Sequence, residues 1–227
     1  MYLLDMTYNR ENKTVADEYI NQLFAREDDA LLKIREELRK DGKEGINVGP
    51  HEGKLLQFLV RAFQVKKIVE IGTLYGYSAL WMARALPEDG KLHCLEIDPE
   101  NYKKAKELLQ ASDVSNKVEI YLGDANSSLQ SLTNEGPFDM VFIDANKAGY
   151  LEYLNWAEEN VRPGGFIIGD NTFLFGNVFE QPIEVAIQAN DKQIQVMREF
   201  NQRLADPTKY NSILIPTSEG MTIAQKI

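Results

Sequence analysis

The chain has 227 residues, of which 35 are acidic and 25 basic, so its formal net charge is -10 at neutral pH. This length fits one large domain or two small ones, and an apolar share of 44% excludes intrinsic disorder. The net negative charge disfavours sequence-independent binding of nucleic acid, which needs a basic face. A local basic patch would still permit such binding. No apolar run approaches the roughly 18 residues of a membrane span.

The chain contains a single cysteine, Cys94, which excludes an internal disulfide framework. One thiol without a partner in the chain is typical of a reducing compartment. The first 13 residues are polar and lack the apolar segment of a secretory signal. We therefore expect a cytoplasmic protein.

The first third of the chain has the pattern of helices. From Thr14 onward apolar residues recur at helical spacing with charged residues between them, and Asp41-Gly42 ends the series. A second helix is expected from Glu52 to Phe63. We interpret residues 1–45 as an N-terminal helical arm of a single domain that spans residues 1–227. The arm either packs on the core or forms a lid or dimer contact, and the spacing alone favours packing.

From Lys67 onward, apolar runs alternate with helical stretches. Continuous hydrophobicity within a run is typical of strands buried on both faces, as in a parallel sheet. The last two runs are separated by only four residues, too few for a crossover helix, so they should form an antiparallel hairpin. The sequence therefore predicts an α/β fold with a doubly wound, Rossmann-like, mostly parallel sheet that ends in an antiparallel C-terminal hairpin. The expected strands occupy residues 67–71, 91–97, 117–122, 138–144, 164–170, 212–216 and 221–227.

The first predicted strand runs into the segment EIGTLYGYS (70–78), after which a helix begins. Gly72 and Gly76 allow a sharp turn and a close approach of a ligand. Their spacing is not the G-x-G-x-x-G of pyrophosphate-binding turns. Glu96 ends the next strand, where a carboxylate can accept hydrogen bonds from both hydroxyls of a ribose. These features indicate a nucleoside ligand, and Glu96 alone does not distinguish a dinucleotide from S-adenosylmethionine.

Two further loops border the expected crevice. Asp124 follows the third strand, where it either lies beside the adenine of the ligand or caps the next helix. Val48 precedes the second helix and would reach the ligand from the N-terminal side.

Polar side chains also stand at the ends of the fourth and fifth predicted strands. Asp144 ends the fourth strand, and Asp170 ends the fifth and is followed by Asn171. Residues at the carboxyl ends of strands line the ligand crevice of an open α/β sheet, so we expect these three to converge beside the nucleoside. Lys147 lies three residues past Asp144, on the same side of a helical first turn. Two carboxylates and one amide oxygen suit Mg²⁺, Ca²⁺ or Mn²⁺, whereas the cysteine and the two histidines lack zinc-ligand spacing. Beside such a cation the ammonium form of Lys147 is disfavoured, so this lysine would serve as a general base.

Six segments, in order from Ile46 to the end of the chain, resemble the cation-dependent O-methyltransferase family, which includes catechol and caffeoyl-coenzyme A O-methyltransferases. They read INVGPHEGKLL, VEIGTLYGYSALWMA, LEIDP, FDMVFIDANKAGY, VRPGGFIIGDN and GMTIAQKI. The resemblance implies S-adenosylmethionine as the ligand, held by Val48, Glu70, Gly72, Thr73, Ser78, Glu96, Ala125 and Asp144. It also implies that a divalent cation, Mg²⁺ before Ca²⁺ or Mn²⁺, binds Asp144, Asp170 and Asn171, and that Lys147 and Asp144 are catalytic.

By the same resemblance the chain is a homodimeric enzyme that methylates a hydroxyl of a small catechol-like or caffeoyl-type acceptor, without a membrane or nucleic-acid partner. Two alternatives stay open: a methyltransferase acting on RNA, and a non-catalytic dimeric protein that keeps the cofactor pocket. Phe173, Phe175 and Tyr210 are candidate walls of the acceptor pocket. The resemblance implies least about the identity of the acceptor. Ile46 stands where many members of the family have methionine, and the Trp-Asn pair that follows the metal ligands in the plant enzymes is missing after Asn171.

Overall fold

The N-terminal part of the chain forms two helices where the apolar spacing predicted one continuous series. The structure, a computed structural model, describes residues 14–180 and 187–227, so the first 13 residues of the predicted arm lie outside it. The helices are α1 (Val15–Leu23) and α2 (Asp29–Lys40). Asp28 caps α2, since its carboxylate accepts a hydrogen bond from the amide of Leu31 (3.2 Å). The cap starts a new helix in the middle of the series of apolar residues. The apolar spacing alone does not show this interruption between α1 and α2.

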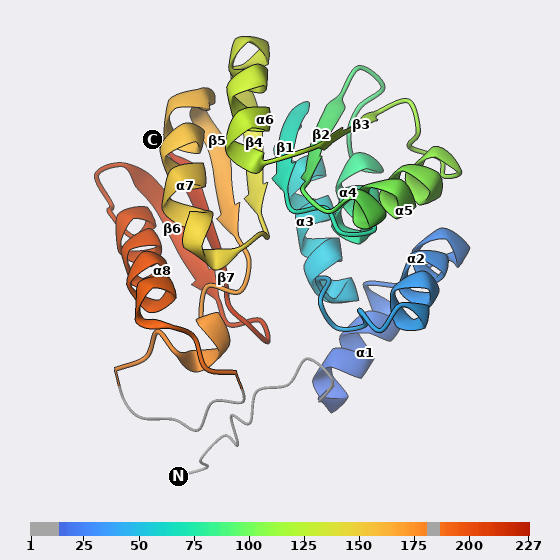
Figure 1. The fold of residues 1–227 in the computed structure, drawn as a ribbon, viewed down its shortest axis with the longest axis horizontal. Helices are drawn as coiled ribbons and strands as arrows, with labels where there is room; N and C mark the ends of the chain where they lie inside the picture. Colours follow the sequence, from blue (N-terminus) through green and yellow to red (C-terminus); the bar gives the residue numbers. More distant parts are fainter. Residues whose placement is uncertain (1–13, 181–186) are drawn as a thin grey trace.

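Seven strands form one sheet in the order β3-β2-β1-β4-β5-β7-β6, shown in Figure 1. The five strands from β3 to β5 are parallel to their neighbours, while β7 runs antiparallel to both β5 and β6. This confirms the predicted mostly parallel sheet and its C-terminal hairpin. The strands are β1 (Lys67–Ile71), β2 (Lys91–Glu96), β3 (Val118–Leu122), β4 (Phe138–Ile143), β5 (Val161–Gly169), β6 (Tyr210–Ile215) and β7 (Met221–Lys226).

Helices cover both faces of the sheet. Successive side chains of a strand point to opposite faces, so Ile68 of β1 joins one buried apolar cluster and Val69 joins the other. The first cluster lies under α3, α4 and α5, and the second under α6, α7 and α8 (Figure 1). No helix of the described ranges is both long and apolar enough to cross a bilayer. The remaining helices are α3 (Pro50–Ala62), α4 (Tyr77–Ala83), α5 (Pro99–Gln110), α6 (Ala125–Leu132), α7 (Tyr150–Asn160) and α8 (Asp191–Leu204), with short 3₁₀ turns η1 (Thr133–Glu135), η2 (Lys147–Gly149) and η3 (Leu174–Gly176).

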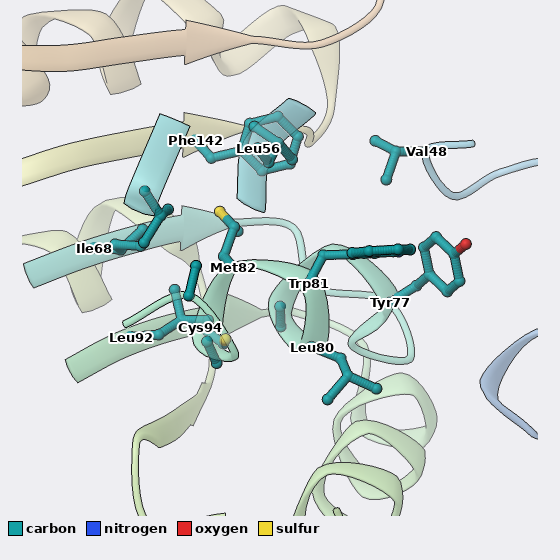
Figure 2. Packing of buried hydrophobic residues seen from close by; sticks show 14 of the residues in the cluster. Val48, Leu56, Ile68, Tyr77, Leu80, Trp81, Met82, Leu92, Cys94 and Phe142 are labelled. Carbon is teal, nitrogen blue, oxygen red and sulfur yellow. The ribbon is translucent and has the colours of Figure 1, made fainter. Parts of the chain in front are cut away.

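Helix α4 is buried along its whole length and anchors the turn that follows β1. All seven of its residues are buried. Figure 2 shows the sulfur end of Met82 of α4 directed toward Phe142 of β4 and Leu56 of α3, while Trp81 lies beside Tyr77. Truncating such a side chain to alanine costs about 2–5 kcal/mol. This packing holds the start of α4, and with it the segment 72–76, against the carboxyl end of the sheet.

Strand β3 departs from the burial expected of it. Its residues are intermediate or exposed and none is buried, and Leu122 is 48% exposed. The continuous apolar run predicted a strand buried on both faces, but β3 is an edge strand of the sheet. An edge strand has a neighbour on one side only, so its faces are less completely covered.

Candidate active site

A cavity of about 250 Å³ opens at the carboxyl ends of β1, β2 and β4. Strand β1 leads to β2 on one side and pairs with β4 on the other, so the strand order reverses here, as it does at the ligand crevice of doubly wound sheets. Seven of the eight residues expected to hold the nucleoside cofactor line this cavity: Val48, Gly72, Thr73, Ser78, Glu96, Ala125 and Asp144.

Two glycines make the turn after β1 possible. Gly72 has a φ of +91°, and a Cβ on it would lie 2.1 Å from the carbonyl oxygen of Asp144. Gly76 has a φ of +86°, and a Cβ there would lie 2.6 Å from a methyl group of Leu109. Positive φ and these close approaches both exclude a larger residue. The turn therefore runs directly against the loop that follows β4 and brings Asp144 to the wall of the cavity.

Glu70 lies beneath the cavity wall and is fully buried. Its carboxylate accepts hydrogen bonds from the hydroxyls of Ser78 (2.5 Å) and Thr73 (3.0 Å). Burial raises the pKa of Glu70 to about 7, against the lowering effect of these two hydroxyls and the Cys94 thiol. Glu70 does not itself line the cavity. Its hydrogen bonds instead hold Ser78 and Thr73, which both line the cavity.

Glu96 closes the opposite side of the cavity at the end of β2. The two oxygens of its carboxylate accept hydrogen bonds from the backbone amides of Leu74 (2.8 Å) and Asp98 (2.9 Å). Each oxygen has a second lone pair, so the fixed carboxylate can still accept hydrogen bonds from a ligand diol. Asp124 caps α6 through the amide of Ser127 (3.0 Å), as one of its two alternative predictions states, and it also lines the cavity. Its place beside an adenine stays a prediction.

A polar cluster adjoins the cavity at the ends of β4 and β5. The ammonium nitrogen of Lys147 lies 2.8 Å from Oδ1 of Asn171 and 3.5 Å from Oδ1 of Asp144. Asp170 is fully buried next to Asn171, and its carbonyl oxygen lies 3.5 Å from the same nitrogen. The structure thus brings together the three residues that the sequence predicted to converge and places Lys147 among them, because β4 and β5 are adjacent parallel strands.

The donor set of this cluster fits a divalent cation of the Mg²⁺ class. Asp144, Asp170 and Asn171 offer carboxylate and amide oxygens, the hard ligands that Mg²⁺, Ca²⁺ and Mn²⁺ prefer. Two of these oxygens already converge on one positive charge, the ammonium of Lys147. Across the part of the chain that the structure describes, no group of three or more His, Cys, Asp or Glu side chains is arranged to hold a metal ion. The described residues therefore contain no second metal site built from three such side chains. The site formed by Asp144, Asp170 and Asn171 is not among them, because its third ligand is the amide oxygen of Asn171.

Two residues of the cluster escaped the sequence analysis. The hydroxyl of Tyr150 donates to the carbonyl oxygen of Asp170 (2.8 Å) and accepts a hydrogen bond from Lys147 (2.6 Å). Its position three residues after Lys147, on the first turn of α7, was an available signal. Glu219 accepts a hydrogen bond from the side-chain amide of Asn171 (3.1 Å). It lies in the hairpin turn, and nothing in its local sequence pointed to the site.

The proposed aromatic walls are only partly near the cluster. The hydroxyl of Tyr210 donates to Glu158 of α7 (2.8 Å). Tyr210 pairs with Lys226, at the end of the sheet opposite the cavity, so its prediction as a pocket wall is wrong. Phe173 packs against Phe179 and over Gly220, next to the hairpin turn.

Known proteins resemble this chain in sequence and in fold. A family model described as O-methyltransferase matches residues 21–227. A catechol O-methyltransferase from Niastella koreensis is 39% identical over 92% of this chain and 95% of its own length. Caffeoyl-CoA O-methyltransferase 1 from Eucalyptus globulus is 31% identical over 90% of this chain and 85% of its own. The crystal structure of the O-methyltransferase TomG from Streptomyces achromogenes, in complex with SAM, has a TM-score of 0.84 at 35% identity and covers 96% of this chain and 98% of that one.

This chain belongs to the O-methyltransferase family. The family predicted from the six sequence segments is thereby confirmed.

Proposed function

We propose that the chain works as a cytoplasmic homodimer that transfers the methyl group of S-adenosylmethionine to a hydroxyl of a small catechol-like or caffeoyl-type acceptor, with a divalent cation. Its relatives named for catechol and caffeoyl-CoA support the acceptor class, and the SAM complex of TomG supports the cofactor. The dimer is supported by α1, which buries none of its residues and leaves Val15 85% and Tyr19 62% exposed.

The cavity residues divide the work of holding the cofactor. Glu96, fixed by two backbone amides, would accept hydrogen bonds from the ribose hydroxyls. Thr73 and Ser78, oriented by Glu70, would contact the amino-acid part. Val48 lines the cavity from the loop before α3 and Ala125 from the start of α6, where it would lie beside the adenine. Asp144 lines the same cavity and also belongs to the polar cluster, so the methyl donor and the acceptor would meet there.

The polar cluster would carry out the chemistry. Asp144, Asp170 and Asn171 would hold a divalent cation, which would supply Lewis acidity that makes a bound hydroxyl more acidic. Lys147, in its neutral form, takes the hydroxyl proton at Nζ. The acceptor oxygen forms the new bond to the methyl carbon, and the bond from that carbon to sulfur breaks with its electron pair returning to sulfur. The in-line displacement gains mainly from the positioning of the two reactants.

One observation carries this proposal: a lysine nitrogen lies within 3.5 Å of oxygens from both loops of an oxygen-donor triad beside the cofactor cavity. The test is an assay of methyl transfer to catechol and to caffeoyl-CoA with Mg²⁺ or with EDTA. We expect activity with Mg²⁺ only. Asp144→Ala should abolish it, and Lys147→Ala should lower kcat by about 10²-fold or more with little change in cofactor affinity. Full activity in EDTA would exclude the role of the cation.

A matched control separates the role of Lys147 from a general effect of removing a charge. Lys192 is an exposed lysine on α8, away from the cluster, and Lys192→Ala should keep the activity of the unchanged chain. An equal loss in both lysine variants would contradict the assignment of Lys147 as the base. Sedimentation velocity on the same samples reports whether the chain is a dimer.

A further inference from the structure

A buried carboxylate from the distant C-terminal hairpin reaches the oxygen cluster. Glu219 belongs to the turn between β6 and β7 and is only 3% exposed. Strand β7 runs antiparallel to β5, so the chain enters β7 where β5 ends, beside Asp170 and Asn171. The topology of the sheet therefore delivers this turn to the cluster from 48 residues further along the chain.

Backbone contacts fix the position of the turn. The amide of Thr172 donates to the carbonyl oxygen of Gly220 (2.9 Å), and the amide of Phe173 donates to that of Glu219 (2.9 Å). Gly220 has a φ of +71°, and a Cβ on it would lie 2.7 Å from the ring of Phe173. The turn is thus bound to the loop that follows β5 by main-chain hydrogen bonds and close packing. The Glu219 side chain is delivered into the cluster as a consequence.

Asn171 links Glu219 to Lys147 through the two ends of its amide. Its nitrogen donates to Oε2 of Glu219 (3.1 Å), while its oxygen accepts from Nζ of Lys147 (2.8 Å). A carboxylate only accepts hydrogen bonds and an ammonium only donates them, so the chemistry of these partners dictates which end of the amide points where. Without an acceptor on its nitrogen side, the amide would lose one of the two contacts that set its orientation.

We propose that Glu219 is a positioning residue that holds the amide oxygen of Asn171 toward the cation site and adds negative charge to it. This inference rests on the cation dependence of the proposed function. A carboxylate that accepts from the far side of a ligand orients that ligand and increases its electron density, and ligand charge also sets the affinity of oxygen sites for divalent cations. Glu219 therefore adds its negative charge on the far side of Asn171, whose amide oxygen accepts from Lys147.

Two variants separate orientation from charge. In Glu219→Leu the acceptor and the charge are both lost, while the volume of the side chain is nearly kept. In Glu219→Gln a side-chain oxygen can still accept from Asn171, but the charge is gone. The probe is Mn²⁺ alone, titrated against the full-length chain without cofactor or acceptor, and the free ion is measured by electron paramagnetic resonance. We expect the Kd for Mn²⁺ to rise about 10-fold or more in Glu219→Leu and about 3-fold or more in Glu219→Gln.

The control is Glu199→Gln, which removes one negative charge from an exposed position on α8. It should bind Mn²⁺ as the unchanged chain does. S-adenosylhomocysteine, titrated without metal, should bind all variants alike, since Glu219 does not line the cofactor cavity.

The outcomes distinguish this inference from the proposed function. If the unchanged chain binds Mn²⁺ and both Glu219 variants bind it within twofold as tightly, Glu219 does not position Asn171 and the inference is overturned. If the unchanged chain binds no Mn²⁺ at all, the cation dependence of the proposed function fails, and the inference fails with it. Should Glu219→Leu not fold, as judged by circular dichroism, Glu219→Ala takes its place, because alanine also lacks both the acceptor and the charge. Glu219→Gln then reports the effect of the charge alone.

Discussion

Replacing Glu70 by glutamine should remove a large pH dependence from the stability of the chain. The Glu70 side chain is fully buried, and burial raises its pKa from the ordinary 4.5 to about 7. Glutamine has almost the same shape and keeps one oxygen to accept from Ser78 or Thr73. A hydroxyl can rotate to accept from the new amide group, so the substitution removes the titration while largely preserving the packing.

The sign follows from the two pKa values. Below pH 4.5 the carboxyl is protonated in the folded and the unfolded chain alike. Between pH 4.5 and 7 the unfolded chain gives up the proton while the folded one keeps it, so the free energy of unfolding falls as the pH rises. The difference between about 7 and 4.5 corresponds to about 3 kcal/mol in total, of which about 2 kcal/mol falls between pH 5.5 and pH 8.

Urea unfolding at pH 5.5 and pH 8, without cofactor or metal, measures this change. Other groups also titrate in the interval, among them His93, whose pKa is lowered by burial. Subtracting the Glu70→Gln variant from the unchanged chain cancels their contribution. We expect the stability of the unchanged chain relative to the variant to drop by about 2 kcal/mol between the two pH values. If the stabilities of the two proteins run parallel between pH 5.5 and pH 8, Glu70 does not titrate in this range and the reasoning is refuted.

Two further predictions concern the turn after β1 and the lysine. Gly72→Ala should lower the free energy of unfolding in urea by about 2 kcal/mol or more, because its Cβ would meet a backbone oxygen at 2.1 Å. The control is Gly42→Ala, which has a φ of +68° but open space around it and should lower the free energy of unfolding less. Equal losses in the two variants would contradict the steric argument. Tyr150→Phe keeps the ring against Phe200 but removes the oxygen that Lys147 contacts. Steady-state kinetics should therefore show kcat lowered about 10-fold or more, with unchanged affinity for S-adenosylhomocysteine. An unaltered kcat would argue against a role of Tyr150 in orienting the lysine.

Much of the fold was predictable because its signals are local. Each of the five parallel strands follows from one apolar run, and the four-residue connection between the last two strands permits only a hairpin. The limits of the helices depended on side-chain caps, and the cap at Asp28 divided a series that spacing had joined. The exposure of β3 was not predictable, because it depends on the order of the strands in the sheet. A run of apolar residues does not indicate whether its strand lies at the edge.

The site divides in the same way. Asp144, Lys147, Asp170 and Asn171 were predictable, because strand ends are visible in the sequence and adjacent parallel strands carry their ends to one place. Glu70 was identified as part of the cofactor site, but only the packing placed it beneath the cavity, where it contacts two hydroxyls. Tyr210 was assigned to the wrong end of the sheet, because register is not visible in a single strand.

The sequence by itself determined the class of fold, the family and the residue types of the site, since these follow from periodicity, short connections and motifs within single segments. Only the tertiary structure decided which groups meet across long separations. The contact between Asn171 and Glu219 joins two loops 48 residues apart, and it exists because an antiparallel strand returns beside β5. Neither residue carries a local signal for the other, because their distance is set by the sheet and not by the chain between them.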